Sequence, residues 1–111
     1  MDLATIRETE WGGMQVTLES YHKTMDMAPL LKGLPDDKCQ CPHWGMVLKG
    51  RMLVKYRDHE EVVKAGEVYY MAPGHSPMMD PSTELVEFSP IEEALKSRQI
   101  IERNLQAMMQ R

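Results

Sequence analysis

The sequence lacks three features that would each assign it to a familiar class of protein. It has only two cysteines, Cys39 and Cys41, and these are too close together for an ordinary disulfide and too few for a four-cysteine zinc ribbon. It has no apolar run approaching the ~20 residues of a membrane-spanning helix, and no basic-then-apolar leader at its N-terminus. Because reduced thiols are typical of a reducing compartment, we expect a cytoplasmic protein that makes no contact with membranes.

Positive charge is also scarce. Lysine and arginine number 13 against 17 acidic residues, which gives a formal net charge of −4. The basic residues form no stripe along the chain, and this argues against nucleic acid as the main partner and against a basic membrane-binding surface. A chain of 111 residues is long enough for one domain with a small core.

What the chain does contain is a series of short alternating segments separated by turn residues. Residues 1–13 are interpreted as an arm that ends in a glycine turn, and residues 14–20 as a half-buried strand. Further strands are predicted over residues 46–49, 52–57, 61–64, 68–71, 76–79 and 83–88. Several short strands at this spacing indicate an all-β fold, either an antiparallel sandwich or a barrel.

The segments outside these strands have a different character. Residues 21–38 are expected to form a long, partly packed connection with one helical turn at residues 29–32. Residues 90–110 are predicted to form an amphipathic helix, because Ser89 and Glu92 match a capping box and an apolar stripe follows at helical spacing. The stripe consists of Ile91, Leu95, Ile101, Leu105, Met108 and Met109.

These segments combine into one domain. Residues 1–38 are expected to pack on a barrel core of residues 39–89, and residues 90–111 to form a C-terminal α-helix. The sequence leaves open whether this helix docks on its own barrel or on another subunit. Met108 and Met109 near its end favour a homodimer.

Residue types that bind metals gather just before one of the predicted strands. Cys39, Cys41 and His43 alternate in the sequence, and residues two apart point to the same side of an extended chain. A further histidine, His75, follows a Pro-Gly turn about one strand pair later. Thiol and imidazole donors that share one face indicate a metal site.

The spacing of these residues and turns resembles that of the cupin family of small β-barrels, over about residues 36–89. The first motif of that family has His-x-His, three or four residues, Glu, six residues and Gly. When the motif is anchored on Gly50, its Glu falls at His43, its second His at Cys39 and its first at Asp37. The resemblance therefore lies in the spacing, while the ligand types differ.

The second motif of the family has Gly, five residues, Pro-x-Gly, two residues and His. Gly66 fits the first position, Ala72 replaces the proline and Gly74 stands as the pattern requires. Pro77 falls at the position of the family's histidine, and His75 lies two residues earlier, which keeps it on the same face of the strand.

The resemblance implies an antiparallel, jelly-roll-like barrel in which Cys39, Cys41, His43 and His75 converge inside on a divalent metal ion. A Cys/His set favours zinc or iron. We expect Cys41 to be the leading thiol ligand, since it is nearer His43 in sequence. The alternatives are histidines that only form hydrogen bonds in a pocket and cysteines that only pack in the core.

An apolar ligand pocket is expected beside the metal. Its candidate residues are Met46, Met52, Tyr56, Met71 and Met78. A methionine-rich strand face also suits an ordinary core. Trp44 should point away from His43 and is assigned to core or dimer packing, and His59 in a charged turn is expected to be solvated.

Two classes of function follow from this interpretation. In the first, the protein is a metal-dependent cupin that acts on or binds a small organic molecule, with the metal polarising a carbonyl or activating water or dioxygen. In the second, it is a non-catalytic module that senses a ligand, a metal or the redox state of its thiols. A degenerate cupin without metal, acting through its dimer surface, is a third reading. The sequence names no acid–base pair, so no catalytic residue is assigned.

Overall fold

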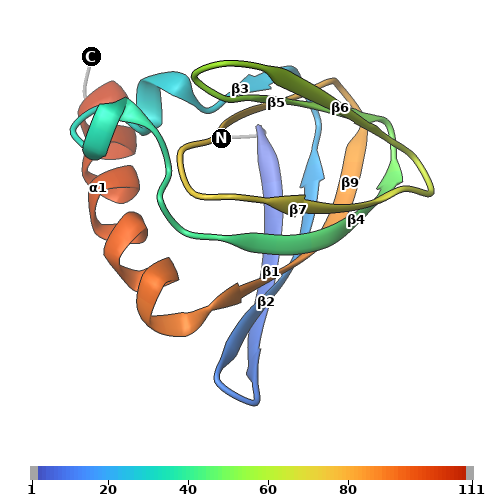
Figure 1. Cartoon of the computed structure of the whole chain (residues 1–111), viewed down its shortest axis with the longest axis horizontal. Coiled ribbons are helices and arrows are strands. Elements are labelled where there is room, and N and C mark those ends of the chain that lie inside the picture. Colours follow the sequence, from blue (N-terminus) through green and yellow to red (C-terminus); the bar gives the residue numbers. More distant parts are fainter. Residues whose placement is uncertain (1–2, 110–111) are drawn as a thin grey trace.

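The computed structural model describes residues 3–109, and within them nine strands form two antiparallel sheets that face each other (Figure 1). The larger sheet has the order β1 (Ala4–Trp11), β2 (Met14–Tyr21), β9 (Thr83–Pro90), β4 (His43–Lys49) and β7 (Val68–Met71). The smaller sheet has the order β3 (Met25–Asp26), β8 (Ser76–Met79), β5 (Arg51–Lys55) and β6 (Glu60–Lys64). This arrangement confirms the prediction of an antiparallel, jelly-roll-like barrel.

The turn between β4 and β5 shows why a glycine is required at one end of the barrel. Gly50 has a φ of 79°, in the left-handed region, and a Cβ atom there would lie 2.4 Å from Oγ1 of Thr83. The hydroxyl of Thr83 donates to the carbonyl of Arg51 and accepts from its N–H, with both distances 3.1 Å. These bonds join the β4–β5 hairpin to β9 and hence one sheet to the other.

The N-terminal residues form a strand where the sequence predicted an arm. β1 pairs with β2 over its whole length, from Ala4 opposite Tyr21 to Trp11 opposite Met14. The two glycines between the strands both have positive φ, as a two-residue hairpin turn requires. β1 was not recognisable because both of its sides carry polar residues, a pattern that is typical of an edge strand and gives no hydrophobic period.

β2 is a strand, as predicted, but its polar side faces the inside of the barrel. Gln15, Thr17 and Tyr21 are buried, whereas the side chain of Leu18 is 42% exposed on the outer face. The alternation was therefore predicted correctly, but the burial of the polar side was not, because the interior beside Gln15 and Thr17 is a polar site, while Tyr21 reaches the hydrophobic core and Val16 on the other side is also buried.

The hydrophobic core lies between the two sheets. Its buried residues from the larger sheet are Tyr21, Val47, Met71 and Leu85, and those from the smaller sheet are Met52, Val54, Val63 and Met79. A second cluster consists of Leu31, Cys39, Cys41 and Ala94. Full burial of an aliphatic side chain contributes about 1.5–3 kcal/mol, so these facing side chains hold the sheets together.

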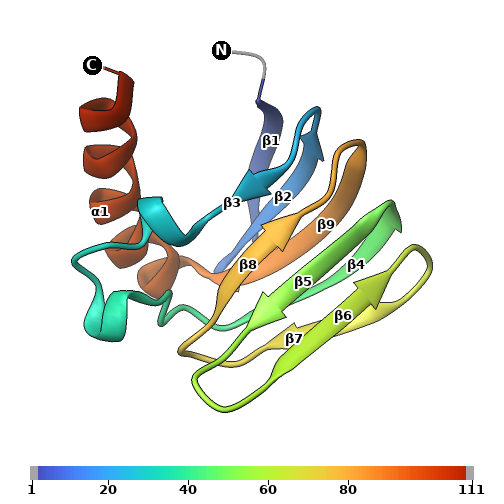
Figure 2. The same cartoon turned by 90° about the horizontal axis from the view of Figure 1, so that it is seen from above.

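The remaining elements lie at one end of the barrel. The connection between β2 and β4 contains β3 and two short 3₁₀ helices, η1 (Ala28–Leu30) and η2 (Pro35–Asp37). The helix α1 (Ile91–Met109) follows β9 directly and begins one residue later than predicted, because Pro90 ends the strand; residues 110–111 lie outside the described part. Figure 2 shows α1 standing beside the sheets, next to the 3₁₀ helices.

The packing of α1 answers the question that the sequence left open, because the helix docks on its own barrel. The side-chain amide of Asn104 donates hydrogen bonds to the carbonyls of Leu30 and Lys32, each at 2.8 Å. Arg98 forms an ion pair with Glu8 of β1, with Nη2 and Oε2 2.5 Å apart. Within residues 3–109, no helix combines the length and the apolar character that a membrane crossing requires.

Candidate metal and ligand site

A cavity of about 340 Å³ lies inside the barrel, and α1 forms part of its wall. The inner faces of both sheets line it, with His43 and His75 on one side and Ala94, Ser97 and Arg98 of α1 on another. The volume is at the lower end of the range found for ligand-binding pockets, about 300–1,000 Å³. The cavity is therefore large enough for a small organic molecule.

Cys39, His43 and His75 come together at this cavity, and their donor atoms all lie within 4.8 Å of one another. Sγ of Cys39 lies 3.8 Å from Nε2 of His43, and the two imidazole rings meet edge to face with their centroids 4.9 Å apart. Ligands of a tetrahedral zinc ion, at about 2.3 Å for sulfur and 2.0–2.1 Å for nitrogen, lie roughly 3.4–3.6 Å from each other. A metal ion fits this group with only small movements of the side chains.

Backbone pairing holds Cys39 and His75 together. The N–H of Cys39 donates to the carbonyl of His75 at 2.9 Å, in an isolated bridge between the connection and the start of β8. His43 enters from the first residue of β4, where the ladder of the larger sheet begins. Three separate segments of the chain thus contribute one donor each.

The second nitrogen of each imidazole ring is held in the way that is typical of metal-binding histidines. Nδ1 of His75 lies 2.7 Å from the carbonyl of Ala72, and since a carbonyl only accepts, this nitrogen carries the hydrogen and leaves Nε2 with a free lone pair. Nδ1 of His43 lies 2.6 Å from the hydroxyl of Ser89 and 3.4 Å from Oε2 of Glu87. Such partners fix the ring orientation and aim Nε2 at the site. Ser89, predicted as the helix cap, thus lies within β9 beside His43.

The titration of the group suits metal binding near neutral pH. Burial lowers the pKa of His43 and of His75 to about 4, so both imidazoles are neutral and able to coordinate. Burial raises the pKa of the Cys39 thiol above its usual range. Because only the thiolate binds a metal strongly, binding must release the thiol proton.

Cys41 is not one of the three grouped donors, although it also lines the cavity and the sequence favoured it over Cys39 as a ligand. Its thiol is buried, 3.5 Å from the carbonyl of Pro42, and burial raises its pKa to about 12. The chain bends at Cys41, so residues 39–43 are not continuously extended and the assumed alternation fails.

The expected apolar pocket is present only in part. Met52 and Met71 line the cavity, whereas Met46, Tyr56 and Met78 are not among its lining residues. Met46 alternates with Val47, which is fully buried and points inward, and Met78 alternates with the inward-pointing Met79. The hydroxyl of Tyr56 instead accepts a hydrogen bond from the N–H of Ala72 at 3.0 Å.

Two carboxyl groups that the sequence reasoning missed, those of Glu19 and Glu87, also line the cavity. Glu19 accepts hydrogen bonds from the hydroxyls of Thr17, at 2.6 Å, and Tyr21. Glu87 accepts one from the hydroxyl of Tyr69 at 2.7 Å. Burial raises the pKa of both carboxyls to about 7, and the neighbouring Glu87 charge adds to the effect at Glu19.

The alternation of polar and apolar residues on β2 and β9 contains these two carboxyls, but it suggests that they face solvent. Glu19 lies on the polar side of β2, which is the side that a half-buried strand normally turns to water. Thr17 pairs with Glu87, so Glu19 and Glu87 are diagonal neighbours on one sheet face. Only the pairing of two strands far apart in sequence reveals them as a pair.

A glycine in β4 admits the tyrosine that contacts Glu87. Gly45 is paired with Tyr69 of β7, and a Cβ atom at Gly45 would lie 2.6 Å from the hydroxyl oxygen of Tyr69. Any larger residue would have to displace the Tyr69 ring and the backbone of Val86, whose carbonyl oxygen would lie 2.3 Å from the added Cβ atom. Gly45 thus leaves room for the tyrosine whose hydroxyl donates to the Glu87 carboxyl.

No protein-family model matches this sequence, and no curated protein matches it either. Solved structures are similar in fold. A cupin superfamily protein from Desulfitobacterium hafniense has a TM-score of 0.59 at 9% identity, with 78% of this chain and 76% of that chain covered. A cupin-2 domain containing protein from Shewanella frigidimarina has a TM-score of 0.51 at 16% identity, over 77% and 78%.

A third similar structure comes from a larger protein. It is an HTH_3 family transcriptional regulator from Vibrio cholerae, with a TM-score of 0.56 at 13% identity. The match covers 79% of this chain but only 51% of the regulator. At such low identities the likeness concerns the fold alone. Together with the two facing sheets and the terminal helix, it shows that this chain is a small protein of the cupin fold.

Proposed function

We propose that this protein binds a divalent metal ion, zinc or iron, through Cys39, His43 and His75, and that the bound metal meets a small organic molecule in the adjoining cavity. The observation that supports this best is the convergence of three donors within 4.8 Å, with Nε2 of His75 left free by the bond from its Nδ1 to a carbonyl. A mixed thiol and imidazole set suits zinc and iron better than the harder divalent ions.

The number of protein donor atoms also favours a metal site with a coordination position open to a small molecule. Structural zinc sites close with four protein ligands, whereas three protein ligands leave a position open. When bound here, the metal would supply Lewis-acid polarisation of a carbonyl or activation of water. The protein's own contribution would be to orient His43 through Ser89 and Glu87 and to hold or accept a proton at the Glu19 and Glu87 carboxyl oxygens, which line the same cavity.

A second candidate function is a sensing module without catalysis. It is favoured by the likeness to a protein named as a transcriptional regulator, in which a domain of this fold accounts for about half of the chain. A redox sensor is less suited to this site, since reactive cysteines are exposed and have lowered pKa values, whereas Cys39 and Cys41 are buried with raised ones. Thiols that stay reduced are consistent with a cytoplasmic location.

Elemental analysis of protein produced with added zinc and iron and purified under reducing conditions tests the metal proposal. We expect about one metal ion per chain in the wild type. His75→Ala and Cys39→Ser should each lose most of the metal, because each removes one of only three ligands. His59→Ala is the matched histidine control, since that side chain is exposed and contacts Asp58 and Glu61 on the surface.

Cys41→Ser is the matched thiol control and should retain the metal. Wild-type protein that contains no metal, or a Cys41→Ser variant that loses as much as Cys39→Ser, would refute the assignment. Catalysis and sensing are then separated by following a bound molecule over time, because a sensor releases it unchanged.

A further inference from the structure

The buried carboxyl groups of the cavity have no basic partner. Within residues 3–109, neither Glu19 nor Glu87 forms an ion pair with lysine or arginine, and the contact of Glu87 with Nδ1 of His43 is 3.4 Å long. Arg98 is the only lysine or arginine among the described residues that line the cavity, and it is paired with Glu8. The inner wall is therefore rich in negative charge and acceptors.

The hydroxyl groups around Glu19 and Glu87 add no free donors to the cavity, because they already donate hydrogen bonds to these carboxyls. Thr17 and Tyr21 donate to Glu19, and Tyr69 donates to Glu87. A carboxylate has about four acceptor positions, so each group keeps some that no protein donor fills. A ligand that brings donors of its own can use them.

The charge of the occupied site points the same way. A divalent metal ion carries two positive charges and the Cys39 thiolate one negative charge, so the two carboxyls leave one negative charge in excess in the state in which both are ionised. Uncompensated charge in a buried site is strongly unfavourable. A ligand with one positive charge removes the excess, whereas an anionic ligand doubles it.

We propose that the cavity takes a small organic cation, a protonated amine on a short apolar body, whose ammonium group donates hydrogen bonds to Glu19 and Glu87. This inference rests on the proposed function, because it concerns the same site and counts the charge of its metal. The apolar body has a matching surface in the cavity, formed by Met52, Met71, Met79 and Leu85.

Three probes of nearly equal size test the proposal: phenethylamine, phenethyl alcohol and phenylacetate. Their dissociation constants are measured by ligand-observed NMR on the zinc-supplied protein. We expect the amine to bind at least tenfold tighter than the alcohol, and phenylacetate to bind most weakly. Equal affinities, a preference for the acid or no binding of any probe would overturn the proposal.

Variants assign the preference to the carboxyl pair. Glu19→Gln and Glu87→Gln should each weaken amine binding about tenfold or more while leaving the alcohol unchanged, and retained alcohol binding shows that the cavity is intact. Glu60→Gln is the matched control, because Glu60 is exposed on β6. Amine binding that is unaffected by both cavity variants would contradict the assignment, and if the variants do not fold, the ranking of the probes on the wild type decides.

The metal content of the same samples keeps the two proposals apart. A metal-free protein that still prefers the amine would refute the proposed function and support the carboxyl pair as a cation site. A zinc-loaded protein that shows no preference for the amine would support the proposed metal site and refute the carboxyl pair as a cation site.

A different observation concerns the outer face of the larger sheet. The strand registers place apolar side chains there in two rows that cross β2, β9, β4 and β7. One row is Val16, Phe88, Trp44 and Tyr70, and the other is Leu18, Val86, Met46 and Val68. None of these eight side chains is charged, and the rings of Trp44 and Tyr70 lie 5.2 Å apart.

Much of this outer face is open to solvent. Leu18 is 42% exposed, Trp44 44%, Tyr70 49% and Val68 78%, whereas Val16 is buried at 7%. With about 150–250 Å² for a fully exposed large side chain, these four exposed side chains offer roughly 400 Å² of apolar surface, and the partly exposed Met46, Val86 and Phe88 bring the total to roughly 500 Å². A standard interface takes about 800 Å² from each partner, of which about 65% is apolar in homodimers, and this again amounts to roughly 500 Å².

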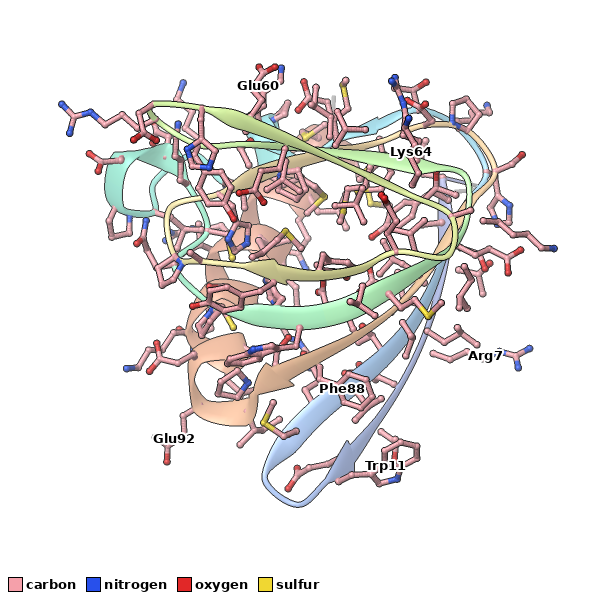
Figure 3. All side chains as sticks on the ribbon, turned by 45° about the vertical axis from the view of Figure 1, so that its right-hand side comes forward. Arg7, Trp11, Glu60, Lys64, Phe88 and Glu92 are labelled. Carbon is pink, nitrogen blue, oxygen red and sulfur yellow. The ribbon has the colours of Figure 1, made fainter. Side chains whose placement is uncertain are left out.

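We propose that a second copy of this chain covers the outer face, with the two larger sheets packed against each other about a two-fold axis. The area matches what such a dimer needs, and the absence of charge in both rows allows the face to meet its own copy without repulsion. In Figure 3, Arg7 and Trp11 project from the β1 edge of the sheet, where polar residues of β1 would form the rim.

Sedimentation velocity tests this proposal with a matched pair of valines. The wild type should sediment as a dimer, Val68→Lys and Trp44→Lys should sediment as monomers, and Val62→Lys should remain a dimer. Val62 is also exposed, at 46%, but belongs to β6 of the smaller sheet. A monomeric wild type at tens of micromolar, or dissociation by Val62→Lys alone, would overturn the proposal and leave the face to another partner.

Discussion

At the scale of single residues, four buried titratable groups decide how the stability of the metal-free protein depends on pH. The pKa values of Glu19 and Glu87 rise from the usual 4.5 to about 7, so the native state binds more protons than the unfolded state between these values and loses stability as the pH increases. The pKa values of His43 and His75 fall from 6.5 to about 4, so stability is lost as the pH decreases through that window. The two effects oppose each other.

Replacing Glu87 with Gln removes one of these opposing effects. The free energy of unfolding of Glu87→Gln, relative to the wild type, should increase as the pH is raised from about 5 to about 8, by up to about 3 kcal/mol. Urea denaturation of chelator-treated protein at several pH values measures this difference. A difference that is the same at all pH values would show that Glu87 titrates normally and that the carboxyl is solvated.

At the scale of elements, the sequence predicts strands well where turn residues mark their ends, and poorly where burial must be inferred. The strands from β4 to β9 and the helix α1 lie within a few residues of their predicted positions, because glycines, prolines and a clear apolar stripe bound them. β1 was missed because both of its sides are polar, and the burial of the polar side of β2 was not predicted because it depends on the polar cavity behind that strand.

The candidate site was predictable to a similar degree. The alternation in sequence predicted Cys39 and His43 as metal ligands. The bridge between Cys39 and His75, which brings the second histidine to them, and the bend at Cys41, which leaves that thiol outside the group, are visible only in the structure. The carboxyl pair depends on the pairing of β2 with β9, two strands at opposite ends of the sequence. Long-range pairing is not encoded in local periodicity, and so these contacts were beyond the reach of spacing arguments.

The attachment of α1 depends on one half-buried amide more than on its surface ion pair. Asn104→Ala removes the hydrogen bonds to the carbonyls of Leu30 and Lys32 and, at about 0.5–1.5 kcal/mol for each bond, should lower the free energy of unfolding by about 1–2 kcal/mol. Arg98→Ala breaks the pair with Glu8, whose side chains are 36% and 46% exposed, and should change it by less than about 1 kcal/mol. Urea denaturation and hydrogen exchange of α1 measure both, and an equal or reversed ranking would contradict the prediction.

At the scale of the whole molecule, one part of the larger sheet, beside the cavity, reverses the usual division between a polar outside and an apolar inside, while the rest of its inner face belongs to the hydrophobic core. Its inner face carries Thr17, Glu19, Glu87 and His43 around the cavity, while its outer face carries the two apolar rows. A sheet arranged in this way loses part of its stability inside, where polar groups are buried, unless something else contributes. A metal, a ligand and a partner subunit are the contributions that the two faces are suited to receive.

Metal binding should therefore act on the stability of the entire chain, and its pH dependence identifies the ligand atom involved. The Cys39 thiol is protonated near neutral pH because burial raises its pKa, whereas the two imidazoles are already neutral, so each zinc ion that binds must release at least the thiol proton. The zinc affinity of the wild type should increase about tenfold per pH unit between about pH 6 and about pH 8. At a free zinc concentration of 100 times the dissociation constant, the bound metal adds about 2.7 kcal/mol to the free energy of unfolding.

Competition with a zinc-binding indicator measures the affinity, and Cys39→Ser is the control that should lose both the affinity and most of its dependence on pH. If the wild-type affinity were independent of pH, or if the slope persisted unchanged in Cys39→Ser, the thiol of Cys39 would not be a ligand.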